Sequence, residues 1–256
     1  MDTDAVLQLL KDVAEEAINP RFRSLADGEI HEKNPGDLVT DADREAEELL
    51  TKALLGAYPD AVVLGEEAHS AEPALMERYL AADHAFTVDP VDGTKNFVHG
   101  SPDHAVMVAE TIGGQAVRAW IWQPQHELAY VAERGAGAWC GSRRLSRSAA
   151  VAPLDGRTSR RKWIGESFGG LPPLALTWVS CGIDYPKLVE GETDYIVYRS
   201  VAPWDHVPGT LILREAGGVA GTPSGTAYEP RLRPRHGLVV AADEATYDTV
   251  RTALPS

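Results

Sequence analysis

The sequence predicts an α/β fold in which helices alternate with strands and a run of antiparallel strands follows. Two observations predict it. In the N-terminal part, apolar residues recur at helical spacing, and short apolar runs that end in turn residues separate these segments. From residue 104 to 140, successive apolar runs are broken by "GG", "QPQ" and "RGAG", which is typical of an antiparallel meander. Together the two patterns indicate a layered α/β architecture.

The bulk composition narrows the possible functions. The chain has 256 residues, of which 44% are hydrophobic, enough for one large domain or two closely packed lobes. Its formal net charge of −14 argues against general binding of nucleic acid. Cys140 and Cys181 are too few for a disulfide framework or a thiolate zinc site. The N-terminus has neither a signal peptide nor a membrane span, so we expect a cytoplasmic protein without a membrane partner.

The first elements can be placed in order along the chain. Apolar residues from Val6 to Ala17 share one helical face, which ends near Pro20. A second helix is expected to begin at Thr40, because Thr40 and Asp43 have the spacing of a capping box. The next expected elements are a strand at 61–64, a short helix at 73–80 and a second strand at 85–88.

The C-terminal part follows a polar segment rich in glycine and proline, residues 152–173, which we interpret as a linker between two lobes. The lobes would comprise residues 1–150 and 151–256. The elements expected after the linker are strands at 174–180, 195–198 and 238–241, and helices at 183–190, 205–216 and 244–253.

Acidic residues gather at three places that follow short apolar runs. They are Glu66 with Glu67, Asp89 with Asp92, and Asp205. Because ligands bind beyond strand ends in open α/β sheets, these carboxylates are candidate metal ligands. Oxygen ligands suit Mg²⁺ or Mn²⁺. A single Asp-x-x-Asp pair is more often a solvated turn, and it is the combination of three clusters that favours a bound cation.

The stretch "DPVDGTKNF" combines a possible cation site with a possible phosphate site. Asp89 and Asp92 can face one centre, and the Val91 carbonyl between them can contribute another oxygen. Gly93 lets the backbone approach a ligand closely, and Thr94 can open a helix whose free N–H groups suit a phosphate. Hydrolysis of a phosphate ester needs this pairing of cation and phosphate.

These motifs resemble those of the inositol monophosphatase family of magnesium-dependent, lithium-sensitive sugar-phosphate phosphatases. "DPVDGTKNFVHG" is similar to the first family signature, D-P-[IL]-D-G-T-x-N-F, and "PWDHVPGTLILREAGG" to the second, W-D-x-x-x-G…E-A-G-G. "GDLVTDAD" and "LGEE" lie upstream in the order of the family. The resemblance implies an αβαβα sandwich like those of inositol monophosphatase and fructose-1,6-bisphosphatase. It also implies a homodimer that hydrolyses a small phosphorylated metabolite.

The resemblance implies a set of metal ligands. Glu66, Asp89 and the Val91 carbonyl would hold the activating Mg²⁺. Asp89, Asp92 and Asp205 would hold a second ion, and Glu66 would help with a third. The lobe of residues 1–150 would thus carry the main metal site, and the lobe of residues 151–256 would supply Asp205.

It also implies residues that bind phosphate or assist proton transfer. Gly93 and Thr94 would bind the phosphate through backbone N–H groups. Thr94, hydrogen-bonded to Asp43, would help to deprotonate the attacking water. Glu67 would orient that water or Glu66.

Three departures from the family leave the substrate open. Lys95 replaces a small hydroxyl residue and either faces the phosphate pocket, pairs with a neighbouring acid or lies in solvent. Tyr198 stands about where inositol-selective members carry a glutamate. Arg199 beside it either meets a second anionic group of the substrate or lies at an interface. "VSCGIDYP" replaces a run of small residues, although it retains Asp184.

Inositol 1-phosphate is therefore the leading substrate among several. The alternatives are histidinol phosphate, fructose 1,6-bisphosphate and 3′-phosphoadenosine 5′-phosphate. A different class of function is a protein-binding regulator on the same fold, because relatives also act as partners of the transcription machinery. The complete set of acidic ligands favours catalysis, since a binding module has no need of all of them.

Overall fold

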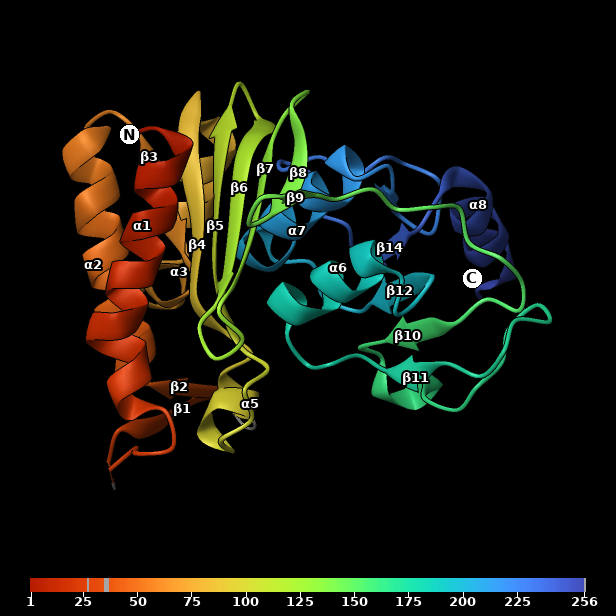
Figure 1. The fold of residues 1–256 in the computed structure, drawn as a ribbon, viewed down its shortest axis with the longest axis horizontal. Coiled ribbons are helices and arrows are strands. Elements are labelled where there is room, and N and C mark those ends of the chain that lie inside the picture. The colour runs from red at the N-terminus through yellow and green to blue at the C-terminus, as the bar shows by residue number, and fades with distance from the viewer. Residues whose placement is uncertain (27, 35–36, 256) are drawn as a thin grey trace.

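Two large β-sheets, a small two-stranded sheet and three layers of helices make up the described part of the molecule (Figure 1). The computed structural model describes residues 1–26, 28–34 and 37–255. Its α-helices are α1 Thr3–Val13, α2 Asp41–Ala57, α3 Glu66–Ala71, α4 Leu75–Ala81, α5 Thr94–Val98, α6 Cys181–Glu190, α7 Pro203–Glu215 and α8 Glu244–Ala253. Within these residues no helix is long and apolar enough to cross a membrane.

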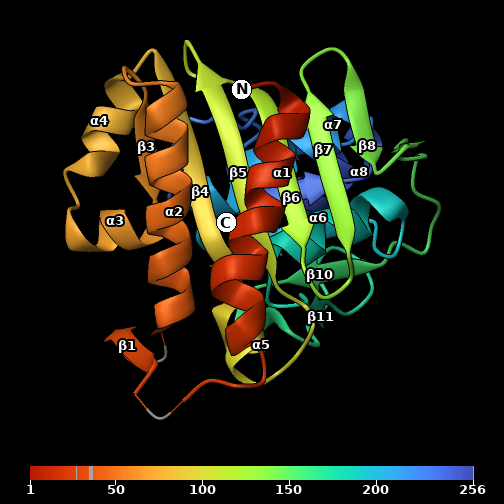
Figure 2. The same ribbon diagram turned by 60° about the vertical axis from the view of Figure 1, so that its left-hand side comes forward.

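The first sheet has seven strands in the order β3-β4-β5-β6-β7-β8-β9. They are β3 Val62–Gly65, β4 His84–Asp92, β5 Ala105–Ile112, β6 Gln115–Gln123, β7 Leu128–Glu133, β8 Gly137–Cys140 and β9 Arg143–Arg144. Strands β3 and β4 run parallel, and each later pair runs antiparallel, which confirms the predicted meander. Helices α1 and α2 cover one face of this sheet (Figure 2).

The second sheet has five strands in the order β11-β10-β12-β14-β13. They are β10 Gly156–Thr158, β11 Ala175–Leu176, β12 Tyr195–Tyr198, β13 Val219–Gly221 and β14 Leu238–Ala241. Helices α6 and α7 lie between the two sheets, where their apolar side chains share one buried cluster with both (Figure 1). Helix α8 packs on the outer face through Tyr247 and Val250. The layers therefore follow the order α-β-α-β-α, as predicted.

Several predicted elements are confirmed with shifted boundaries. The capping box of α2 is present, because the backbone N–H of Thr40 donates to Asp43 Oδ2 at 2.8 Å. The first helix continues beyond α1 as a π-helical turn, Ala14–Ile18, and a 3₁₀ turn, Asn19–Arg21. Strand β4 extends to Asp92 instead of ending near residue 88, and its pairing with β5 shifts register between Asp89 and Asp92. This irregularity turns the backbone at the acidic pair.

Other predictions were wrong in part. The segment 152–173 is not only a linker, because β10 lies in it and pairs with both β11 and β12. Within 174–180 only Ala175–Leu176 forms a strand. Glu66 and Glu67 directly follow strand β3, as predicted, but they also begin helix α3, which was not predicted. Sequence patterns also missed β13 and the antiparallel hairpin of β1, Ile30–Asn34, and β2, Asp37–Thr40.

The division into lobes at residues 150 and 151 stays a prediction. The seven-stranded sheet uses residues 62–144 and the five-stranded sheet uses residues 156–241. Helices α6 and α7 follow the proposed boundary in the chain, yet they pack against both sheets.

Candidate active site

Three elements bring carboxylates together from distant parts of the chain. Glu66 is the first residue of α3, Asp89 lies near the end of β4, and Asp205 lies in the first turn of α7. One carboxylate oxygen from each lies within 4.8 Å of the other two. Divalent cations are bound by oxygen ligands that converge in this way. Three of the predicted acidic residues, Glu66, Asp89 and Asp205, therefore converge in the folded protein.

Asp89 lies at the most strongly buried point of this group. Its side chain is 2% exposed, and its Oδ1 atom has no hydrogen-bond partner among the described residues. Burial raises the pKa of Asp89 well above its usual range, and the nearby carboxylates of Glu66, Asp92 and Asp205 raise it further. A buried, partnerless carboxylate oxygen among other acids is a position that a divalent cation fits.

The environment of Asp92 differs from that of Asp89, because Asp92 accepts hydrogen bonds from the start of α6. The donors are the Ser180 hydroxyl, Cys181 N at 3.1 Å and Gly182 N at 2.7 Å. Burial raises the pKa of Asp92 to about 6, and these hydrogen bonds oppose that rise. Asp92 thus connects β4 to α6, and it also lines the cavity beside Asp205.

The turn after Asp92 has the geometry expected for a ligand-binding helix start. Gly93 adopts φ +85°, and a Cβ atom there would lie 2.9 Å from the Ser180 Cβ. The Thr94 hydroxyl lies 3.1 Å from Asp43 Oδ1 and 3.0 Å from the Val91 carbonyl oxygen, so both can accept from it. The predicted contact between Thr94 and Asp43 is confirmed. Burial raises the pKa of Asp43 to about 7.

Two residues that sequence patterns missed organise the start of α3. Glu47 is 5% exposed and accepts hydrogen bonds from the backbone N–H groups of Glu67, at 2.8 Å, and Ala68, at 2.7 Å. Lys33 Nζ donates to Glu66 Oε1 at 2.6 Å and to Glu67 Oε1 at 2.8 Å. Glu47 lies one turn after Asp43 on the buried side of α2, and this spacing was the available signal.

A cavity of about 300 Å³ opens next to the acidic cluster. Its lining includes Asp92 and Asp205 on one side and the cations Lys95 and Arg161. Arg161 was not among the predicted site residues, whereas the predicted Arg199 is exposed and is not among the residues that line this cavity.

Two other predicted substrate contacts bind each other at this cavity. The Tyr198 hydroxyl donates to Asp184 Oδ2 at 3.2 Å, and the backbone N–H of Trp178 donates to Asp184 Oδ1 at 2.8 Å. Burial raises the pKa of Asp184 well above its usual range. At this position inositol-selective members of the resembling family carry a glutamate, and here the cavity is lined by the Tyr198 hydroxyl group bound to Asp184.

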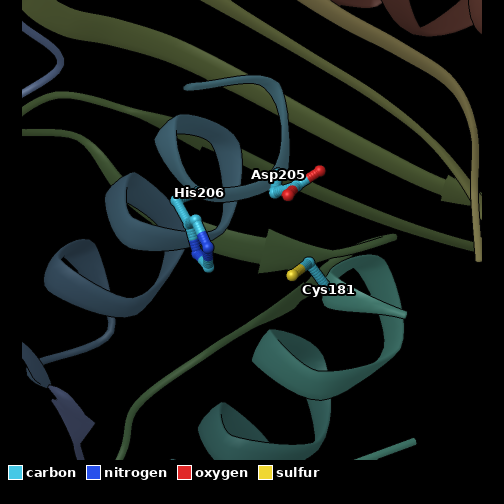
Figure 3. A group of neighbouring side chains, drawn as sticks. All are labelled: Cys181, Asp205 and His206. Atoms are coloured by element: carbon cyan, nitrogen blue, oxygen red, sulfur yellow. The ribbon is translucent and has the colours of Figure 1, made fainter. Parts of the chain in front are cut away.

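A second group of possible metal ligands consists of Cys181, Asp205 and His206 (Figure 3). Both ring nitrogens of His206 are engaged, because Nε2 donates to the Ser200 carbonyl at 3.0 Å and the Tyr185 hydroxyl donates to Nδ1 at 2.9 Å. Burial lowers the pKa of His206 to about 4 and raises that of the Cys181 thiol well above its usual range. A neutral, fully bonded imidazole and a protonated thiol leave the oxygen cluster as the candidate metal centre.

The fold and the site together define a layered α/β protein with an oxygen-only candidate metal centre at the edge of its first sheet. Residues 2–255 match the model of the inositol monophosphatase family, so the chain belongs to that family.

Known proteins support the same family. An inositol-1-monophosphatase of Rhizobium meliloti is 34% identical to this chain, in an alignment that covers 77% of this chain and 76% of that protein. A Nus factor SuhB of Pseudomonas aeruginosa is 30% identical, in an alignment that covers 77% of this chain and 76% of that protein. Among solved structures, a Thermotoga maritima IMPase superposes with a TM-score of 0.81 at 23% identity. The superposition covers 98% of this chain and 96% of that structure. The structure of an IMPase/NADP phosphatase complexed with Mg²⁺ and phosphate superposes with a TM-score of 0.80 at 19% identity. The superposition covers 98% of this chain and 93% of that structure.

Proposed function

We propose that this protein is a Mg²⁺-dependent phosphomonoesterase that acts on a small phosphorylated metabolite, with inositol 1-phosphate as the leading substrate. The convergence of Glu66, Asp89 and Asp205 within 4.8 Å is the observation that carries this proposal. Family membership and the relatives named inositol-1-monophosphatase support a phosphatase. The related structure that contains Mg²⁺ and phosphate supports the choice of metal.

The residues present fit two or three Mg²⁺ ions, or Mn²⁺ in their place. Glu66, Asp89 and the Val91 carbonyl would hold one ion, and Asp89, Asp92 and Asp205 would hold another. The partnerless Asp89 Oδ1 supports this assignment, because a cation would satisfy it. When bound, Mg²⁺ acidifies water and polarises the phosphate ester.

The protein itself would orient the phosphate and move a proton. Backbone N–H groups of Gly93 and Thr94 would hold the phosphate at the start of α5. The Thr94 hydroxyl would take the proton of the attacking water as it passes its own proton to Asp43, which lies 3.1 Å away. Burial raises the pKa of Asp43, which favours its acceptance of that proton. Glu67 would help to position Glu66.

The cavity supports a substrate whose body carries another negative charge. Lys95 and Arg161 line it, and Tyr198 with Asp184 would contact the body of the substrate. Arg199 lies outside the lining and would act only at the entrance. Fructose 1,6-bisphosphate and 3′-phosphoadenosine 5′-phosphate therefore stay alternatives to inositol 1-phosphate, and histidinol phosphate stays a third.

Phosphate release from these four compounds, measured with Mg²⁺ and with EDTA, tests the proposal. We expect hydrolysis of at least one compound with Mg²⁺ and none with EDTA. Equal release under both conditions, or none from any compound with Mg²⁺, would contradict it. The preferred compound identifies the substrate class, and inhibition by Li⁺ can be measured in the same assay.

A protein-binding regulator is the second candidate function, because relatives about 30% identical to this chain are named Nus factor SuhB. The two functions differ in their need for metal. A regulator would lack turnover with every phosphate ester and would still bind its protein partner in EDTA. For the enzyme, we expect a cytoplasmic homodimer.

A further inference from the structure

A second and larger cavity lies in the C-terminal half of the chain, away from the acidic cluster. Its volume is about 960 Å³, which is in the range of small-molecule sites in proteins. The segment around Arg160, the stretch Leu232–His236 and the end of α8 contribute to its lining. None of the catalytic residues proposed above lines it.

We call this second cavity the arginine cavity. Its lining is positively charged, whereas the whole chain has a negative net charge. Arg160, Arg233, Arg235 and Arg251 line it together with His236, and no aspartate or glutamate is among the described residues that line it. Arg251 pairs with Asp248 at 2.6 Å. The other three arginines make no ion pair with any carboxylate in the part of the chain that the structure describes. In a chain with a net charge of −14, these free cations create a local site for an anion.

Arg160 is held in place and still has an unused donor. Its Nη2 donates to the His236 carbonyl at 2.5 Å, and its guanidinium lies over the Trp163 ring at 4.5 Å. Its Nε–H is buried without a hydrogen-bond acceptor among the described residues. Burial and the neighbouring Arg199 guanidinium lower the pKa of Arg160. An anion bound beside Arg160 would relieve the repulsion between the two cations.

We propose that the arginine cavity binds a small organic phosphate with at least two negative charges. The planar guanidinium groups of Arg160, Arg233 and Arg235 match phosphate oxygens. The side chains of Leu232 and Leu254, which also line the cavity, suit the carbon skeleton of such a ligand.

The arginine cavity shares walls with the catalytic cavity. Ser159 and Arg161 line the catalytic cavity, whereas Arg160 between them lines the arginine cavity. Gly237 follows His236 of the arginine cavity and packs against Tyr198 of the catalytic cavity, because a Cβ atom at Gly237 would lie 2.1 Å from the Tyr198 carbonyl oxygen. A ligand that contacts Arg160 therefore acts on a residue whose two neighbours in the chain line the catalytic cavity. The bound anion thus changes the affinity for substrate, a consequence that rests on the proposed function.

Binding of ATP in EDTA, measured by calorimetry, tests the site itself. Without metal, the acidic cluster repels anions, so binding reports on the arginine cavity. We expect one ATP per chain, and affinity about tenfold or more weaker in the Arg233→Gln/Arg235→Gln variant. Both arginines are exposed, so the fold is preserved. The Lys52→Gln/Arg134→Gln variant removes the same charge from exposed positions elsewhere and should bind as wild type.

Two outcomes overturn the binding site: no ATP binding by the wild type, or equal binding by the wild type and both variants. The coupling has its own test, the KM for the hydrolysed phosphate ester at constant free Mg²⁺ with and without ATP. ATP should change KM in the wild type and in the control variant and have a smaller effect in Arg233→Gln/Arg235→Gln. An equal effect in all three overturns the coupling. Absence of turnover contradicts the proposed function and leaves the binding result intact.

Discussion

Asp89 and Asp92 are only three residues apart, but they have different physical roles. Asp89 has a buried oxygen without a partner, and its neighbours are other acids. Asp92 accepts three hydrogen bonds from Ser180, Cys181 and Gly182, so it also holds the start of α6. A substitution at Asp92 would therefore disturb packing as well as charge. Asp89 is the better position at which to test the metal site.

The Asp89→Asn variant should lose activity without losing stability. Removal of one charge from the cluster weakens metal binding, and we expect turnover with Mg²⁺ to fall by orders of magnitude. In EDTA the same change relieves repulsion with Glu66 and Asp205, so the melting temperature should be equal to or higher than that of the wild type. Steady-state kinetics and thermal unfolding measure the two effects. Near-wild-type turnover in this variant would falsify the ligand assignment.

At the scale of elements, the start of α3 depends on α2. Glu47 on α2 accepts the free N–H groups of Glu67 and Ala68, and Gly65 leaves room for its carboxylate. A Cβ atom at Gly65 would lie 2.2 Å from the Glu47 carboxyl carbon. Helix α3 has six residues, too few for stability alone, so this contact fixes the direction of Glu66.

The Glu47→Gln variant should bind metal more weakly although Glu47 is not a ligand. A glutamine has one acceptor oxygen, so one of the two N–H groups loses its partner and Glu66 loses its fixed position. Changes to such supporting residues weaken metal affinity by about 10–100-fold. Calorimetric titration with Mn²⁺ measures this affinity, and Glu48→Gln on the exposed side of α2 is the matched control. Equal affinities for both variants would show that the contact does not position Glu66.

Local signals in the sequence predicted some elements and not others. The capping box of Thr40 and Asp43, the glycine turn before Thr94 and the alternating strands of the meander each depend on nearby residues, and they were predictable. Strand β10 has three residues in a polar segment and is a strand because β11 and β12 pair with it.

The residues of the candidate site also differ in whether local sequence signals could predict them. The acidic clusters carry recognisable motifs and were found. Lys33 and Arg161 join the site through contacts between distant segments, for which no spacing rule exists, whereas the position of Glu47 one turn after Asp43 was a usable signal. Arg161 lines the cavity whereas Arg199 does not, a distinction that only the folded chain makes.

At the scale of the whole molecule, the buried acids connect stability to pH and metal. The folded pKa values of Asp43 and Glu47 are about 7, above their unfolded values of 3.8 and 4.5. The folded state therefore holds more protons than the unfolded state between these limits. The stabilising contribution is complete below about pH 4 and is lost as pH rises through about 7.

The metal-free protein should thus become less stable from about pH 6.5 to about pH 7.5, above the range in which the lowered pKa of His206 has the opposite effect. Each extra proton of the folded state corresponds to about 1.4 kcal/mol of unfolding free energy per pH unit. Bound Mg²⁺ should reduce this loss, because it stabilises the charged carboxylates of the folded state. Thermal unfolding across this range, in EDTA and in Mg²⁺, measures both effects. A melting temperature in EDTA that rises over this range would contradict the pKa shifts.

The central claim is that Glu66, Asp89, Asp92 and Asp205 hold divalent cations beside the start of α5. Anomalous X-ray diffraction from crystals grown with Mn²⁺ and phosphate measures this most directly. The account predicts anomalous peaks between the oxygens of Glu66, Asp89 and Asp205, with the phosphate against Gly93 and Thr94. Absence of such peaks in Mn²⁺-saturated crystals, or peaks confined to other parts of the protein, would contradict it.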